Sequence, residues 1–356
     1  MVEKEVGVLG MDKQEIQAAV LNLFQTNMGV RPGERVLVIT DVATAEQWRE
    51  RDLEFLTCML NRSLLAKAVA EIAGENLKGC RVDFTTYDAV GKSGTEPPAE
   101  AGQTMRGAEV VIAITTFSLS HTAARQEACR AGARIASMPG VLPETFAPGG
   151  PLSADYRLIA EDTHRMARLL SEARTAALRS PAGTDLRFCL EGREAIADTG
   201  LYVEPGQWGN LPAGEAYIAP VEGSCEGRLV VEAGWYPGLT SNLALIFHAG
   251  EVCAIEGGGE VGQELADLLE LGSPSSPHRQ RRNAAELGVG TNAQARWTEK
   301  PALEVEKIRG TAHVAIGDNA HMGGRVNVDI HYDFIVPQTE LVLDGRAVLR
   351  AGEVVL

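Results

Sequence analysis

The sequence lacks the paired cysteines that build thiolate metal sites. Its six cysteines are scattered over 356 residues, and no two of them form a C-x-x-C motif. A zinc knuckle is therefore excluded, and the spacing is not that of a disulfide framework in a chain of this length. We expect a protein of a reducing compartment, the cytoplasm.

Long apolar runs and positive charge are also scarce. No segment approaches the length needed to span a bilayer, and the first residues, M-V-E-K-E-V-G, lack a basic region followed by an apolar one. Lys and Arg number 33 against 48 Asp and Glu, which gives a formal net charge of -15. Binding of nucleic acid needs clustered basic residues. We therefore expect no membrane partner, no nucleic acid partner and a small-molecule substrate.

The apolar content is 45%, in a chain long enough for two domains with cores of their own. A helix is expected from Asp12 to about Met28, and further helical segments alternate with apolar strands at residues 34–41, 81–87, 109–115 and 133–136. Such alternation is typical of a doubly wound, mostly parallel sheet. We predict a Rossmann-like α/β domain at residues 1–180, with a last helix to about residue 179 and a linker, S-P-A-G-T, at residues 180–184.

Beyond the linker the pattern changes to short strands, with one helix at residues 260–271. Asp344-Gly345 is a strong signal for a two-residue hairpin turn. We predict a β-rich α+β domain at residues 185–356 that binds metal and carries the catalytic groups. Its expected strands flank the hairpin turn and lie at residues 186–190, 216–220, 227–232, 243–248, 251–256, 313–316 and 326–336.

One glycine-rich stretch imitates a dinucleotide-binding motif. Residues 257–262, G-G-G-E-V-G, satisfy the G-x-G-x-x-G pattern between a predicted strand and a helix. However, the strand follows a hairpin-like segment rather than a βαβ unit, and no acidic residue comes about 20 positions later. We interpret the stretch as a glycine-rich turn and predict no dinucleotide site.

The strand at residues 326–336, V-N-V-D-I-H-Y-D-F-I-V, carries an unusual polar face. Alternation places Asn327, Asp329, His331 and Asp333 on one side, with no cation among them. His331 and Asp333 lie about 7 Å apart along such a strand, close enough to share a metal ion. They supply two of the three ligands of a His/His/carboxylate triad. The alternative is a polar strand face on which the histidine is paired with a carboxylate.

Four more residues of the second half are metal-type donors: Glu222, His278, Glu286 and His313. Each taken alone is more typical of a structural role. Four of the seven histidines, however, lie between positions 278 and 331, among glycine-rich loops. Together with His331 and Asp333 they predict a His/carboxylate metal site.

In the first half, the segment T-T-F-S-L-S-H-T-A-A-R follows the third apolar strand. The carboxyl end of a parallel strand is where open α/β sheets bind ligands. Ser118, Ser120 and Arg125 offer hydrogen-bond donors there, and His121 offers a base that titrates near pH 7. The alternative is capping of the next helix by Ser120 or Thr122.

These motifs together resemble a known group of proteins. S-L-S-H-T-A-A-R, L-P-A-G-E-A-Y-I-A-P-V-E-G, E-L-G-V-G-T-N, H-V-A-I-G-D-N and H-Y-D-F-I resemble the metal-dependent aminopeptidases of the T and S type and their relatives, the 2,5-dihydroxypyridine 5,6-dioxygenases. The likeness covers most of the chain. It also implies a homodimer.

The aminopeptidase resemblance implies a hydrolase with two divalent ions, Zn, Co or Mn. Their ligands would be Glu222, Glu286, His313, His331 and Asp333, with Glu286 bridging the two ions. A tyrosine ligand expected after the H-V-A-I-G strand is absent, because Ala320 and His321 occupy that place.

The dioxygenase resemblance implies one Fe(II) held by His278, His331 and Asp333, and a small hydroxylated pyridine-type substrate. His121 would move substrate protons, with Glu222 and Glu286 as further catalytic candidates. Ser118, Ser120, Arg125 and His313 would contact the substrate. We prefer this interpretation because it gives both His121 and His278 a role, whereas the aminopeptidase interpretation gives His278 none. The alternatives are the aminopeptidase and a non-catalytic, metal-stabilised binding protein.

Overall fold

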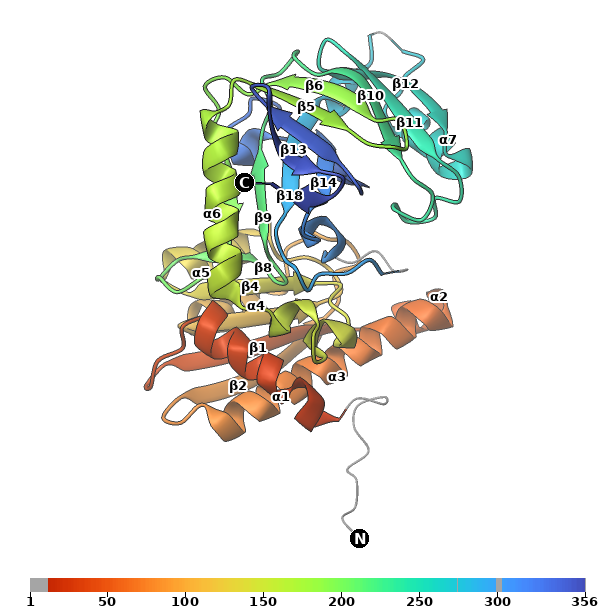
Figure 1. Ribbon diagram of the computed structural model, residues 1–356. Coiled ribbons are helices and arrows are strands. Elements are labelled where there is room, and N and C mark those ends of the chain that lie inside the picture. Colours follow the sequence, from red (N-terminus) through yellow and green to blue (C-terminus); the bar gives the residue numbers. More distant parts are fainter. Residues whose placement is uncertain (1–11, 274, 299–302, 356) are drawn as a thin grey trace. The chain divides into compact units, whose positions relative to one another are not determined.

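The computed structural model describes residues 12–273, 275–298 and 303–355, which form two compact units (Figure 1). Unit one contains residues 12–156 and Gly200–Ala213, and unit two contains Arg157–Thr199 and residues 214–355. Each unit therefore consists of two separate segments of the chain. Within the described residues, no helix is long and apolar enough to cross a membrane.

Unit one is built on a five-stranded parallel sheet, as the strand and helix alternation predicts. The strand order is β2-β1-β3-β4-β8, and every neighbouring pair is parallel. All six residues of β3 are buried, which explains their continuous apolar sequence. The strands are β1 (Arg35–Val42), β2 (Arg81–Asp88), β3 (Val110–Thr115), β4 (Arg134–Pro139) and β8 (Trp208–Asn210).

The helices of unit one begin at polar caps. Asp12 caps the first helix by accepting a hydrogen bond from the Gln14 amide, as expected, and Asp52 caps the longest helix in the same way. The first helix continues as a π-helical turn at Leu23–Asn27. The α-helices are α1 (Lys13–Asn22), α2 (Gln47–Glu50), α3 (Leu53–Asn76), α4 (Ala99–Arg106) and α5 (Ala123–Arg130), with 3-10 turns at Pro143–Phe146 and Pro151–Ser153.

Unit two contains two sheets and one continuous apolar core. The larger sheet has the antiparallel order β12-β11-β10-β6-β5-β16-β17-β18. Its strands are β5 (Thr175–Arg179), β6 (Asp185–Cys189), β10 (Glu226–Val231), β11 (Leu243–His248), β12 (Glu251–Gly257), β16 (Glu340–Leu343), β17 (Arg346–Arg350) and β18 (Glu353–Val354).

The smaller sheet of unit two carries the candidate site. Its order is β15-β14-β13-β9-β7, again antiparallel. The strands are β7 (Ile196–Asp198), β9 (Glu215–Ile218), β13 (Ala284–Gly290), β14 (Ala312–Gly317) and β15 (His331–Val336). The helices of this unit are α6 (Tyr156–Glu172) and α7 (Gly259–Leu268), with 3-10 turns at Arg279–Arg282, Val305–Lys307 and Ala320–Met322.

The structure differs from the expected helix that runs to residue 179. Helix α6 ends at Glu172, and Thr175–Arg179 forms β5, in which Ala176 and Leu178 alternate into the core. The residues expected to form the linker join β5 to β6 within one sheet. The sequence A-A-L favours a helix, but pairing with two neighbouring strands overrides that local preference.

Two turn interpretations are confirmed. Asp344 and Gly345 have φ values of 46° and 85°, as a type I′ hairpin turn requires, and they join β16 to β17. The glycine-rich residues 257–262 link β12 to α7, and β12 lies in an antiparallel sheet. That connection is not a βαβ unit, so it lacks the geometry of a dinucleotide site.

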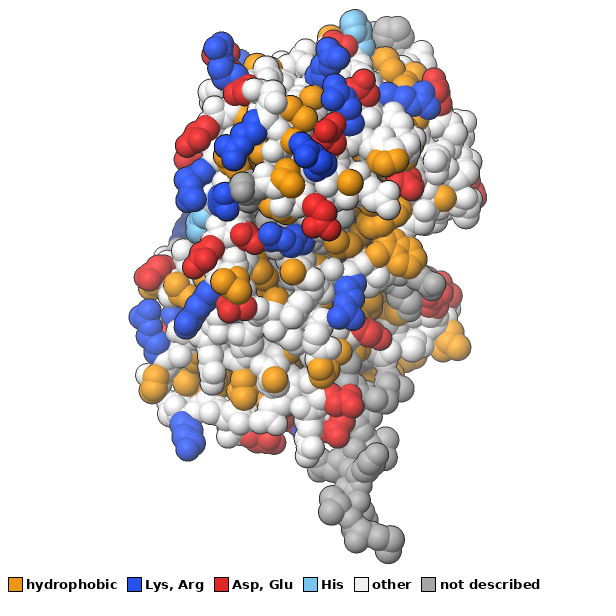
Figure 2. Space-filling view, in the orientation of Figure 1, with side chains coloured by type: hydrophobic (Ala, Val, Ile, Leu, Met, Phe, Trp, Pro, Cys, Tyr) orange, Lys and Arg blue, Asp and Glu red, His pale blue; other side chains and the backbone are white. Residues whose placement is uncertain are grey.

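Surface charges of both signs are mixed on the face drawn in Figure 2. In the larger sheet, Arg179 pairs with Asp185 and Glu340, and Arg228 pairs with Glu256.

Candidate metal centre

Neighbouring strands of the smaller sheet bring metal-type donors together. Glu215 comes from β9, Glu286 from β13, His313 from β14, and His331 and Asp333 from β15. The register places small residues of β14 between them: Ala315 lies opposite both Glu286 and Asp333, and Gly317 lies opposite His331. These small residues let long polar side chains from the flanking strands approach each other.

The donors form two overlapping clusters in the described part of the chain. One contains Glu215, Glu286 and His313, all buried, and the other contains Glu286, His331 and Asp333. Within each cluster the candidate ligand atoms lie within 4.8 Å of one another. Glu286 belongs to both clusters, so its two oxygens face different sites.

Glu286 lies between two imidazole rings. Its Oε1 is 3.0 Å from Nε2 of His313, and its Oε2 is 3.2 Å from Nε2 of His331. Beyond these rings, Nε2 of His313 is 3.3 Å from Glu215, and Nε2 of His331 is 3.5 Å from Asp333. Each Nε2 atom therefore faces two carboxylates, an arrangement in which a divalent cation can replace a proton.

The ring orientation of His331 leaves the correct nitrogen for a metal. Its Nδ1 lies 2.8 Å from the backbone oxygen of Asp318, so Nδ1–H donates that hydrogen bond. Nε2 is then the basic nitrogen that faces Glu286 and Asp333. A hydrogen bond of this kind fixes the tautomer of a metal-binding histidine.

Gly288 makes room for the other imidazole. It lies opposite His313 in the β13–β14 pair, and a Cβ atom there would be 2.0 Å from Nε2 of His313. Any side chain at this position must therefore move the ring. This explains the first glycine of the E-L-G-V-G motif.

The charges of the centre depend on one another. Burial favours a neutral Glu286, but hydrogen bonds from His313 and His331 outweigh burial and hold its pKa well below the usual range. Burial also opposes a charged His313, yet Glu286 and Glu215 raise its pKa to about 9. For His331, Asp333 and Glu286 overcome burial and hold the pKa well above its usual value. Glu286 is therefore anionic and ready for a cation, whereas burial raises the pKa of Glu215 to about 8.

A lysine adjoins the buried cluster. Nζ of Lys307 lies 2.5 Å from Glu215, 2.7 Å from Glu306 and 4.0 Å from Asp198. The Lys307 side chain is only 2% exposed. Its positive charge is thus enclosed by carboxylates and lies beside Glu215.

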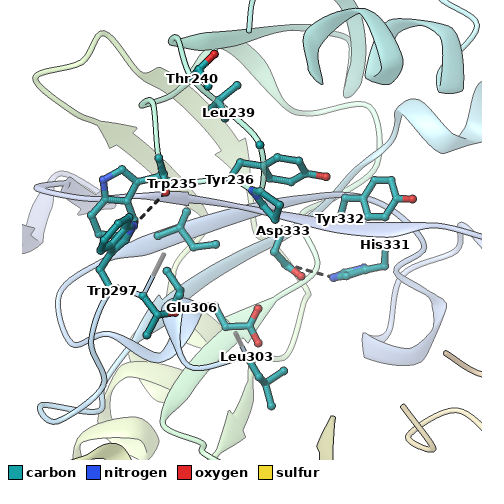
Figure 3. A pocket seen from close by; sticks show the side chains of 16 residues that line it. Trp235, Tyr236, Leu239, Thr240, Trp297, Leu303, Glu306, His331, Tyr332 and Asp333 are labelled. Carbon is teal, nitrogen blue, oxygen red and sulfur yellow. Dashed lines mark hydrogen bonds and ion pairs between the residues drawn. The ribbon is translucent and has the colours of Figure 1, made fainter. Parts of the chain in front are cut away.

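A pocket of about 580 Å³ opens beside the other cluster. His331 and Asp333 line it together with the aromatic residues Trp235, Tyr236, Trp297 and Tyr332. Figure 3 shows the two tryptophans on one side of this space and His331 on the other, next to Asp333. The Glu306 carboxylate also lines the pocket, and burial raises its pKa. The pocket therefore combines flat apolar walls with acidic groups and an imidazole.

Two predicted ligands lie outside both clusters. Nδ1 of His278 is 2.9 Å from Glu270, and the His278 side chain is 47% exposed. Glu222 pairs with Arg193 and accepts hydrogen bonds from Asn319 and the Arg325 amide. The structure thus differs from the predicted two-ion set at Glu222, because β9 ends at Ile218 and only Glu215 projects from that strand into the cluster.

The candidates of unit one form a local network. Ser118 and Ser120 share a hydrogen bond of 3.0 Å, and Ser120 also bonds to Ser137. Arg125 donates to the backbone oxygen of Ser120 and stacks over Trp208. Thr122, one of the two residues expected to cap the helix, caps α5. Ser120 and Arg125 are buried, whereas His121 is exposed and lies edge-on to Trp208.

Sequence comparison decides the family. The family model described as 2,5-dihydroxypyridine 5,6-dioxygenase matches residues 17–356. The chain belongs to this family. The 2,5-dihydroxypyridine 5,6-dioxygenase of Pseudomonas putida (strain KT2440) is 27% identical over 289 residues, covering 77% of this chain and 78% of that protein. The resemblance based on motifs is confirmed.

Solved structures agree on the fold of the dioxygenase family. The structure of the 2,5-dihydroxypyridine dioxygenase from P. putida KT2440 matches with a TM-score of 0.70 at 20% identity, covering 97% of this chain and 98% of that one. Wild-type AmpT from Thermus thermophilus matches with a TM-score of 0.62 at 16% identity, covering 97% and 100%. The likeness to the aminopeptidase is one of fold alone.

Sequence reasoning missed three charged residues of this family member: Glu215, Glu306 and Lys307. For Glu215 a signal existed, because L-P-A-G-E-A-Y-I-A-P places a glutamate at the start of a predicted strand. For Glu306 and Lys307 the signal was weaker, since L-E-V-E-K-I-R-G has the composition of an ordinary solvated segment.

A substitution at Gly288 tests whether this glycine makes room for the His313 ring. In Gly288→Ala the new methyl group must displace the His313 ring, and Glu286 then loses its hydrogen-bond partner. We expect divalent-metal affinity to fall about 10- to 100-fold, the range seen when groups that orient metal ligands are removed. Calorimetric titration with Mn²⁺ measures this. Gly272→Ala, which has no atom within 4 Å of the added Cβ, is the matched control. Unchanged affinity in Gly288→Ala would contradict the role of His313.

The raised pKa of His313 predicts how the stability of the metal-free protein depends on pH. Histidine in an unfolded chain titrates near about 6.5, and His313 in the folded protein titrates near about 9. The stabilisation is fully present below about pH 6.5 and is lost as the pH rises through 9. Thermal melts between pH 6 and 9.5 should therefore show a fall in melting temperature that is smaller in His313→Asn. An equal fall in both proteins would refute this assignment.

Proposed function

We propose that this chain is a mononuclear, non-haem iron(II) dioxygenase that cleaves the ring of a small hydroxylated pyridine-type aromatic. One observation carries the proposal: His331 and Asp333 belong both to a metal-type cluster and to the lining of an aromatic pocket. Membership in the 2,5-dihydroxypyridine 5,6-dioxygenase family supports the same reaction.

The residues of the centre fit a divalent iron. His331 presents Nε2, Asp333 presents a carboxylate oxygen, and an imidazole combined with carboxylates suits iron(II). Bound iron would supply the redox chemistry that ring cleavage by O2 requires. The protein's own part is to hold the imidazole in one tautomer and to keep Glu286 anionic.

Two residues compete for the third ligand position. Glu286 already lies 3.2 Å from Nε2 of His331. His278, which the family resemblance assigns, is paired with Glu270 in this structure and would have to leave that partner. We propose His331 and Asp333 as the ligands common to both arrangements.

The pocket suits a flat ring with polar substituents. Indole and phenol groups of Trp235, Tyr236, Trp297 and Tyr332 form its apolar walls, and aromatic faces stack well on a planar heterocycle. Tyr236 is itself stacked on Phe334 of β15, with ring centroids 5.1 Å apart, which holds that wall in place. The ring's oxygen substituents would then point to the end that carries His331, Asp333 and Glu306.

Two groups are candidates for moving substrate protons. Glu306 lines the pocket, and its raised pKa lets the carboxyl group hold a proton closer to neutral pH than an ordinary glutamate can. His121 is the residue that the resemblance assigns to this task. In unit one, the bonds of Arg125 and Ser120 fix the backbone beside His121.

Activity with the family's named substrate tests the proposal. Protein loaded anaerobically with Fe(II) should consume O2 when 2,5-dihydroxypyridine is added, and Asp333→Asn should lose about 100-fold or more of this activity because it removes an anionic ligand. Asp267→Asn, an exposed position on α7, is the charge-matched control. Iron binding without any O2 uptake would favour the non-catalytic alternative.

The iron content of two variants identifies the third ligand. If His278 is a ligand, His278→Ala should lose iron while Glu286→Gln retains part of it. If Glu286 is the ligand, only Glu286→Gln should lose iron. Retention of full iron by both variants would contradict a three-ligand site at His331 and Asp333. Light scattering on the same preparations checks the homodimer that the resemblance implies.

A further inference from the structure

Two neighbouring clusters of similar donors raise the question of how many ions the chain can hold. Each contains one imidazole and two carboxylates, and Glu286 is common to both. They differ in what lies next to them. The cluster with Asp333 borders the pocket, whereas the cluster with Glu215 borders the buried ammonium group of Lys307.

We infer that Lys307 serves as a built-in cation that keeps a second metal ion out of the Glu215–Glu286–His313 cluster. The lysine is thus a determinant of metal number, and it limits the chain to a single ion. The inference builds on the proposed metal centre, but it needs neither the ring substrate nor O2.

The contacts of Glu215 show why the two cations exclude each other. Its Oε1 atom is 2.5 Å from Nζ of Lys307, and its Oε2 atom is 3.3 Å from Nε2 of His313. An ion bound by Glu215 would therefore lie within a few ångströms of the ammonium group. Like charges repel strongly where solvent cannot screen them, and Glu215 and Lys307 are both buried.

Lys307 cannot easily move aside. Its Nζ is held by Glu306 as well as by Glu215, and these carboxylates with Asp198 outweigh burial and keep its pKa well above the usual value. Its backbone is also fixed, because the Asn292 amide donates to the Lys307 carbonyl and the Lys307 amide donates to Glu304.

Gly290 allows this segment to approach the site. A Cβ atom at this position would lie 2.1 Å from the Ile308 carbonyl oxygen and 2.7 Å from the carbonyl carbon of Lys307. The two glycines of E-L-G-V-G therefore have separate tasks: Gly288 admits the His313 ring, and Gly290 admits the chain that carries the lysine.

The test is to count bound Mn²⁺ in the full-length protein. Wild type and Lys307→Met, which keeps much of the side-chain volume but no charge, are titrated with Mn²⁺ after removal of metal. Bound ion per chain is measured by mass spectrometry, and paired ions are detected by the spin coupling in their EPR spectra. We expect Lys307→Met to gain one ion per chain relative to wild type, with a coupled Mn²⁺ pair.

Two further variants isolate the charge. Lys307→Arg keeps the cation and should show the wild-type count. Lys307→Met/Glu215→Gln removes a ligand of the new site and should lose the additional ion. If Lys307→Met is unstable without metal, Mn²⁺ should raise its melting temperature far more than that of wild type, because the ion replaces the missing cation.

The outcomes separate this inference from the proposed function. No additional ion and no Mn²⁺-dependent stabilisation in Lys307→Met would overturn the inference, as would two coupled ions in wild type. A wild type that binds no Mn²⁺, with one ion gained in Lys307→Met, would support the inference and count against the metal centre proposed at His331 and Asp333.

Discussion

The buried carboxylate of Glu286 is the group on which the candidate metal centre depends. A carboxylate enclosed in a protein is stable only when its charge is compensated, and here the compensation comes from His313 on one oxygen and His331 on the other. The two rings are in turn held by Glu215 and Asp333. The centre is therefore one continuous row of alternating carboxyl and imidazole groups, and a change at any member alters the others.

The backbone around this row is shaped by small residues. A Cβ atom at Gly288 would meet the His313 ring, and one at Gly290 would meet the Lys307–Ile308 backbone. Ala315 lies opposite both Glu286 and Asp333. On the pocket side, aromatic rings supply apolar walls next to His331 and Asp333. The smaller sheet thus provides the polar groups needed to bind a cation. Its edge strand, β15, also lines a pocket suited to a planar substrate.

Much of the candidate site could be predicted from sequence where period-two alternation is strong. His331, Asp333 and His313 were identified as donors on strands, and Glu286 lies in a recognised motif. Glu215 was missed in favour of Glu222, because strand register, not sequence spacing, decides which glutamate faces the cluster: Glu215 pairs across from Gly290, whereas Glu222 lies beyond the strand end. The role of Lys307 could not be predicted, because its segment has no periodicity and its partners Asp198 and Glu215 lie far away in the sequence. Residues 200–213 belong to unit one although they follow a segment of unit two, and this non-local arrangement could not be predicted from sequence either.

Anomalous X-ray diffraction at the iron absorption edge, on crystals grown anaerobically with Fe(II), tests the central claim most directly. The account predicts one strong peak per chain, within bonding distance of Nε2 of His331 and a carboxylate oxygen of Asp333, and no peak between Glu215 and His313. A peak away from His331 and Asp333, or two peaks of similar height on either side of Glu286, would contradict it.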